Sequence, residues 1–184
     1  MAATHELIET LTATGGSSTS LEFTSIPQTY SDLEIVWSFK YNSFSSSHAS
    51  YHNTFWRING VTTTTVYPFQ YQGMHYGSGT ARWYYNTSTY FELLAGIAAD
   101  NTYSAACGRM MFYDYTNSST TGKSIQSFHS NMSYNADQYD RSMLAQSSNL
   151  NYASSVTPLK VYPYNNNYFD GESYMKLYGI DRSA

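Results

Sequence analysis

The sequence predicts an all-β protein: an antiparallel β-sandwich, jelly-roll-like, in which residues 1–184 form a single domain. Composition gives the first reason, because 20 Tyr, 9 Phe and 3 Trp make 32 aromatic residues against 22 charged ones (9 Lys and Arg, 13 Asp and Glu). Tyrosine and threonine suit pleated surfaces, whereas serine, threonine and asparagine compete with helical backbone hydrogen bonds. The second reason is the pattern, since about ten short strand-like runs are separated by turn residues.

The first half of the chain carries the clearest strand signals. Strands are predicted over residues 5–13, 21–24, 33–41, 55–60 and 61–72, and the stretch 82–90 is rich in tyrosine. The run 33–41 is the strongest, since its apolar residues alternate with polar ones and turn one face inward. Pro27 ends the second strand because proline cannot donate to a ladder. The serine-rich stretch 42–50 and the glycine-containing stretch 73–80 are predicted to be loops.

The second half continues the pattern, with one stretch that differs. Strands are predicted over residues 109–115, 123–134, 156–162 and 173–178. Asp170-Gly171, between two strand-like runs, is typical of a β-hairpin, and residues 117–122 are a predicted turn. The apolar stretch 90–99 lacks alternation, and residues 92–98 within it are a candidate for one short helix.

The charge balance excludes several classes of protein. Charged residues make up 12% of the chain, and its net charge is −4 with a pI of about 5.6. A nucleic-acid partner would require a basic surface, so none is expected. No apolar stretch approaches the roughly 20 residues of a membrane span, and the N-terminus lacks the basic and apolar regions of a secretory signal. We therefore expect a protein made in a cytoplasm, without membrane insertion.

The sequence offers little for catalysis or metal binding. Cys107 is the only cysteine, which excludes an intramolecular disulfide and a cysteine-based zinc site, and its apolar neighbours predict a buried thiol. The other candidates are three close pairs, His48 with His52, Asp137 with Asp140, and Asp170 with Glu172. The first pair lies in a serine-rich loop, the second in a polar loop and the third in a turn, which aspartate favours. We predict no catalytic residue, no metal site and no cofactor.

Aromatic residues gather around the glycine-containing loop. The cluster consists of Tyr71, Tyr76, Trp83, Tyr84, Tyr85 and Tyr90, with His75 and Arg82 nearby. Tyrosine combines a large contact area with a polar tip and few rotatable bonds, which is why binding surfaces use it. Two interpretations remain open: the rings fill a sandwich face or subunit interfaces, or they form a surface that binds a glycan or a protein.

Four segments resemble small structural proteins of tailed-bacteriophage particles. The stretch from Leu21 to Leu33, which reads LEFTSIPQTYSDL after a first strand HELIET, is similar to their opening F-x-S-I-P-x-T-Y-x-D-L. The close from Ser173 to Ile180 resembles their terminal L-Y-G-I. Between them, FWRING at residues 55–60 is similar to their R-F-N-G strand and turn, and GRMMFYDYTN at residues 108–117 resembles their F-x-I-Y-x-x-N-Y strand.

The resemblance implies a non-enzymatic virion protein with an antiparallel β-sandwich fold that assembles as an oligomer, with a trimer favoured. Its partners would be the phage major capsid protein or neighbouring tail proteins. The first predicted strand begins at about residue 5, without a preceding heptad repeat or linker. The expected role is therefore a capsid decoration (cement) protein, which sits on capsomer junctions and stabilises the shell.

Two other functions remain as alternatives. The first is a tail or fibre receptor-binding protein that recognises host surface glycans through exposed aromatics, with Trp83, Tyr84 and Tyr85 at the centre. The second is a hydrolase acting on host polysaccharide, which needs two converging carboxylates. The carboxylates available to it are Asp114, Asp137, Asp140, Asp170 and Glu172.

Overall fold

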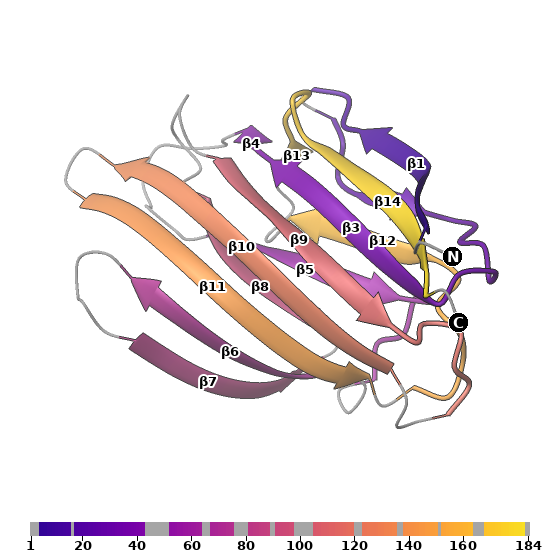
Figure 1. Ribbon diagram of the computed structural model, residues 1–184. Helices are drawn as coiled ribbons and strands as arrows, with labels where there is room; N and C mark the ends of the chain where they lie inside the picture. The colour runs from indigo at the N-terminus through magenta and orange to yellow at the C-terminus, as the bar shows by residue number, and fades with distance from the viewer. Residues whose placement is uncertain are drawn as a thin grey trace.

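Two antiparallel sheets make up most of the molecule, which we describe from a computed structural model (Figure 1). The structure describes residues 4–15, 17–42, 52–63, 67–75, 81–88, 91–97, 105–119, 123–135, 138–150, 152–163 and 168–182, and side chains for 4–15, 17–40, 54–63, 106–119, 123–130, 152–163 and 168–182. The large sheet has eight strands in the order β1 (Thr4–Thr12), β14 (Tyr174–Asp181), β3 (Asp32–Phe39), β9 (Ala105–Tyr113), β10 (Lys123–Asn135), β11 (Gln138–Leu150), β6 (Tyr67–His75) and β7 (Ala81–Ser88).

The small sheet lies behind the large one in the view of Figure 1. Its four strands have the order β2 (Leu21–Phe23), β12 (Leu159–Pro163), β5 (His52–Ile58) and β8 (Phe91–Ile97), and a two-stranded pair joins β13 (Tyr168–Phe169) to β4 (Tyr41–Asn42). All eleven strand pairs are antiparallel. The predicted class, an antiparallel β-sandwich of jelly-roll-like type in a single domain, is confirmed.

Alternation along β3 determines which side chains fill the space between the sheets. Leu33, Ile35, Trp37 and Phe39 are buried, while the residues between them are partly exposed. Trp56 of the small sheet meets Trp37 with ring centroids 6.4 Å apart. Burying each such ring contributes on the order of 1.5–3 kcal/mol, so these rows account for a large share of the hydrophobic stabilisation.

Gly108 of β9 makes room for the Trp37 indole. It lies directly opposite Trp37 on one side and His129 on the other. A Cβ atom at this position would lie 2.6 Å from the His129 Cβ and 2.7 Å from the Trp37 Cζ2. The position therefore requires glycine because a neighbouring strand's ring lies across its backbone.

The structure corrects several local predictions. The candidate helix 92–98 is wrong, because residues 91–97 form β8, which pairs with β5. The predicted loop 73–80 begins too early, since β6 continues to His75. Asp140 lies in the 13-residue strand β11, which pairs with β10 along its whole length, and not in a polar loop. No helix in the described part of the chain is long and apolar enough to cross a membrane.

The turn at Asp170 and Gly171 is present, but it does not connect a hairpin. The preceding strand β13 pairs with β4, whereas the following strand β14 pairs with β1 and β3. A turn signal between two strand-like runs predicts the change of direction, whereas the strand partners depend on contacts far away in the sequence.

Candidate functional site

The outer face of the large sheet, which points away from the small sheet, is the broadest surface that the fold presents. Two cross-strand rows span all eight strands of this sheet. The Phe128 row consists of Thr10, Lys176, Val36, Arg109, Phe128, Ala145, Gln72 and Trp83. The Gln126 row consists of Leu7, Tyr178, Glu34, Met111, Gln126, Ser147, Gln70 and Tyr85. Directly opposed residues share one face of a sheet, so both rows belong to the outer face.

Apolar side chains stand exposed on this face. Phe128 is 51% exposed and Leu7 is 50% exposed, the two large hydrophobic residues that stand out in this way among the described side chains. The Arg109 guanidinium lies 5.7 Å from the centroid of the Phe128 ring. A single exposed apolar residue needs no explanation, but several apolar residues on one face of a sheet make that face a candidate interaction surface.

On the outer face, the Glu34 carboxylate lies beside two basic residues. The Glu34 carboxylate lies 2.8 Å from the Nε2 of His5 and 3.9 Å from Arg109. His5 also stacks on Tyr178, with ring centroids 4.5 Å apart. A partner that covers this part of the face would therefore displace water from the rings while Glu34 keeps its two basic neighbours.

The register divides the predicted aromatic cluster. Trp83 and Tyr85 fall in the two outer-face rows, whereas Tyr71 and Tyr84 lie directly opposite each other in a row that continues through Gln146 to Ser127, a residue of the core side. The other two predicted residues, Tyr76 and Tyr90, lie outside the described residues. The structure thus brings Trp83 and Tyr85, but not Tyr84, into the same set of rows as Phe128.

Phe128 and Arg109 belong to this surface although neither was among the predicted site residues. The signal was available in the run 123–134, where Phe128 falls in phase with the polar residues Gln126 and Ser130. An apolar residue at a solvent-facing position of an alternating strand is the feature that would have identified it.

Three segments, within residues 21–33, 108–117 and 173–180, meet at one end of the large sheet. The ring of Tyr30 lies against Gly179, where any Cβ atom would overlap it. The Tyr115 hydroxyl donates a hydrogen bond to the Pro27 carbonyl, and the Ser31 amide donates to the carbonyl of Ile180 at 2.9 Å. Segments that lie far apart in the sequence therefore form one packed corner.

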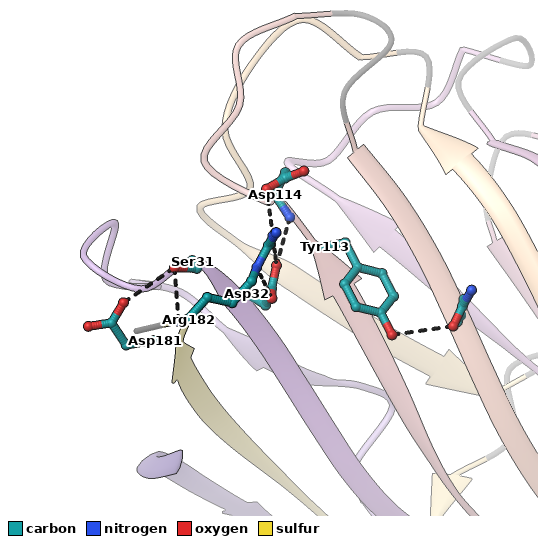
Figure 2. Close-up of polar contacts among 7 residues, drawn as sticks. Ser31, Asp32, Tyr113, Asp114, Asp181 and Arg182 are labelled. Atoms are coloured by element: carbon teal, nitrogen blue, oxygen red, sulfur yellow. Dashed lines mark hydrogen bonds and ion pairs between the residues drawn. The ribbon is translucent and has the colours of Figure 1, made fainter. Parts of the chain in front are cut away.

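An ion cluster closes this corner (Figure 2). Asp32 is almost fully buried, and Arg182 reaches it with two hydrogen bonds of 2.5 and 2.7 Å. Arg182 also bonds to Asp114 at 2.6 Å, and the Asp114 amide donates to Asp32 at 3.0 Å. The two carboxylates, that of Asp32 foremost, raise the pKa of Arg182 well above its ordinary value. The cluster fastens the C-terminus to β3 and β9, which is a structural role.

The other sequence candidates show no catalytic arrangement in the described residues. Lys40 bonds to Glu172 at 2.8 Å and lies 4.0 Å from Asp170, which makes this acidic pair part of a turn. The hydrogen bond from Lys40 lowers the pKa of Glu172. Asp137 and His48 lie outside the described residues, and no group of three metal-ligating side chains occurs within them.

Cys107 corrects the expectation of a buried thiol. It is exposed on the outer face, opposite Ser38 and Ser130, with its sulfur 3.6 Å from the Ser130 hydroxyl. Its apolar neighbour Ala106 faces the core because successive strand residues point to opposite faces. Apolar neighbours in sequence therefore do not predict burial in a strand.

Comparisons with known proteins give likeness of fold only. A scan against family models finds no match, and a search of curated proteins finds none either. Among solved structures, the chain is similar to a peanut lectin solved with a nine-residue peptide, with a TM-score of 0.31 and 8% identity over 99% of this chain and 93% of that one. It is also similar to the carbohydrate recognition domain of Emp46p in its potassium-bound form, with a TM-score of 0.27 and 15% identity over 95% and 87%. TM-scores this low say nothing about a ligand of this chain.

Proposed function

We propose that this chain is a non-enzymatic structural protein of a bacteriophage particle, which binds the outside of the capsid as an oligomer and stabilises the shell. The observation that carries the proposal is the corner in which Tyr30, Gly179 and Tyr115 meet. Short motifs that match by chance have no reason to lie together in space. Their contact supports the interpretation that the resemblance reflects one shared structural unit.

The outer face of the large sheet supports a role in assembly. Phe128 and Leu7 are exposed there, and the register adds Trp83 and Tyr85 to their rows. Covering each ring would contribute on the order of 1.5–3 kcal/mol. In an oligomer on a symmetric shell, such contacts are repeated, so modest individual energies add up to tight attachment.

Labelling of intact particles tests the location. Antibodies against this protein, visualised with gold, should decorate the head and not the tail. Labelling confined to the tail would contradict the decoration role and favour a receptor-binding protein. Neither result alone identifies the surface that makes the contact.

The register provides a matched pair of variants for that surface. Replacing Trp83 and Tyr85 with Ala removes rings from the outer-face rows, whereas Tyr84→Ala changes the intervening residue, which belongs to the opposite face. We expect the double variant to lose attachment and to leave capsids less resistant to heat, and Tyr84→Ala to retain attachment if it folds. Loss of host-cell binding with intact capsid attachment would favour the glycan-binding alternative.

A further inference from the structure

A cleft on the opposite side of the molecule contains a guanidinium group without an anionic partner. The cleft has a volume of about 440 Å³ and lies on the outer face of the small sheet, lined by Glu22, Arg57, Gly60, Pro158, Lys160 and Tyr162. Three strands contribute to it, because Lys160 of β12 lies directly opposite Glu22 of β2 and Arg57 of β5. Its volume falls in the range of small-molecule sites, about 300–1,000 Å³.

The register places two cations side by side with a single carboxylate. Like charges directly opposite each other in a sheet are unfavourable. Glu22 neutralises Lys160, with 3.3 Å between the ammonium and the carboxylate. Arg57 forms no ion pair with any side chain that the structure describes. Among the described residues that line the cleft, two are therefore cations and one is an anion, while Glu92 lies on the same face of the sheet, directly opposite Phe55.

Arg57 is held in a fixed orientation and lacks an acceptor. Its guanidinium carbon lies 5.1 Å from the centroid of the Tyr162 ring, a cation–π arrangement that leaves the N–H edge of the plane available. Its Nε is buried and has no hydrogen-bond partner in the described part of the chain. A buried donor without an acceptor is costly, but this atom is inaccessible from outside, so a ligand in the cleft would bond to the terminal N–H groups of the guanidinium.

We infer that this cleft binds a sugar that carries a carboxylate, such as a hexuronic acid. The Arg57 guanidinium would pair with the carboxylate, since its planar N–H groups match carboxylate geometry. The Glu22 carboxylate, which already neutralises Lys160, would repel a phosphate dianion more strongly than a carboxylate monoanion. The remaining groups suit a hydroxylated ring, because Glu22 accepts hydrogen bonds, Lys160 donates them, and Pro158 and Tyr162 offer apolar walls.

The shape of the cleft favours a sugar ring over the acidic side chain of a protein. Gly60 has a φ of 66°, and an added Cβ atom would meet nothing within 4 Å, so the space beside the turn is open. A cleft of about 440 Å³ would be only partly filled by an aspartate or glutamate tip. This inference is independent of the capsid attachment proposed above, which uses the other sheet.

Titrations followed by ligand-observed NMR test the inference with the intact protein. The probes are glucuronic acid, uncharged glucose, N-acetylglutamate and inorganic phosphate. We expect saturable binding of glucuronic acid, and at least about tenfold weaker binding of glucose, because the charge-assisted hydrogen bonds are lost. Equal binding of glucuronic acid and glucose, tighter binding of N-acetylglutamate or phosphate, or no binding of glucuronic acid would each overturn the proposal.

Three variants locate the site. Arg57→Gln should weaken glucuronic acid binding by about tenfold or more, whereas Arg109→Gln removes a similarly stacked arginine from the other sheet and should leave it unchanged. Glu22→Gln frees Lys160 and should strengthen binding severalfold, a gain that misfolding cannot produce. An equal effect of Arg57→Gln and Arg109→Gln, or weaker binding by Glu22→Gln with its thermal midpoint retained, would contradict the assignment.

Discussion

The ring of Tyr30 lies flat against Gly179, so that the segment before β3 and the last strand of the chain touch without an intervening side chain. Tyr30 is further held by Glu6, whose carboxylate accepts a hydrogen bond from its hydroxyl and raises the pKa of the phenol. Gly179 lies in β14 between Tyr178 and Ile180, whose side chains are on the outer face of the large sheet. The contact therefore joins a tyrosine and a glycine that lie far apart in the sequence.

Gly179→Ala should destabilise the protein through this contact. The new methyl group would overlap the Tyr30 ring, and forcing it aside costs about 1–3 kcal/mol. Urea denaturation of the purified protein measures the loss. In a Tyr30→Ala background the same substitution should cost much less, because the overlapping ring is gone. Additive effects in this double-mutant cycle would show that the ring is not the cause.

Arg182→Gln should loosen the same corner. The substitution leaves Asp32, whose side chain is only 4% exposed, with the Asp114 amide as its remaining described donor. Because Arg182 itself is about half exposed, we expect a loss of about 1–2 kcal/mol, below the cost of breaking a fully buried pair. Thermal unfolding compares the variant with Arg109→Gln, which removes an exposed arginine elsewhere. Equal effects of the two substitutions would remove the special role of Arg182.

Local alternation predicted the strands well, but not which strands pair. The run around Trp37 was clear because one side faces the core, whereas the largely apolar residues 91–97 give no period that distinguishes strand from helix. The Tyr30–Gly179 contact was not predicted, since no local signal links residues 149 positions apart.

The outer face of the large sheet was partly predictable from the sequence, whereas the cleft on the small sheet was not. Composition and the aromatic cluster predicted an assembly or binding face, and the register of β6 and β7 then separated Trp83 from Tyr84. The cleft was not predicted, because Arg57 and Lys160 become neighbours only when β5 pairs with β12. Single charged residues that lie far apart in the sequence do not indicate a binding site until the order of the strands is known.

Lys123 should make the free energy of unfolding vary with pH in the alkaline range. It is almost fully buried, its ammonium bonds to the carbonyls of Asn117 and Ser119, and burial lowers its pKa from the ordinary value of 10.5. Between the lowered pKa and 10.5 the unfolded chain binds more protons than the folded one, so the free energy of unfolding rises with pH in that window.

Lys123→Met removes the pH-dependent rise in the free energy of unfolding that Lys123 causes. It also removes the donor that bonds to the carbonyls of Asn117 and Ser119. The quantity to measure is the difference in unfolding free energy between the original protein and the variant, at a series of pH values from neutral to about 10. We expect the difference to shift in favour of the original protein as the pH rises. Tyrosine ionisation affects both proteins and cancels. A difference that stays constant with pH would mean that Lys123 titrates alike in the folded and unfolded chains.

Cys107 reports whether the outer face is covered in the assembled particle. It is the only cysteine, it is exposed, and Ser38 and Ser130 flank it in the row next to Arg109 and Phe128. A maleimide should therefore react with the free protein and should react much more slowly with protein on intact particles, if the outer face docks on the shell or on a neighbouring copy.

The control carries Cys107→Ser together with Thr62→Cys, an exposed position after β5 of the small sheet. That thiol should react at similar rates in both states, because the small sheet faces away from the contact. Equal protection of both cysteines would indicate burial without a preferred face, and equal reactivity of Cys107 in both states would place the contact elsewhere on the molecule.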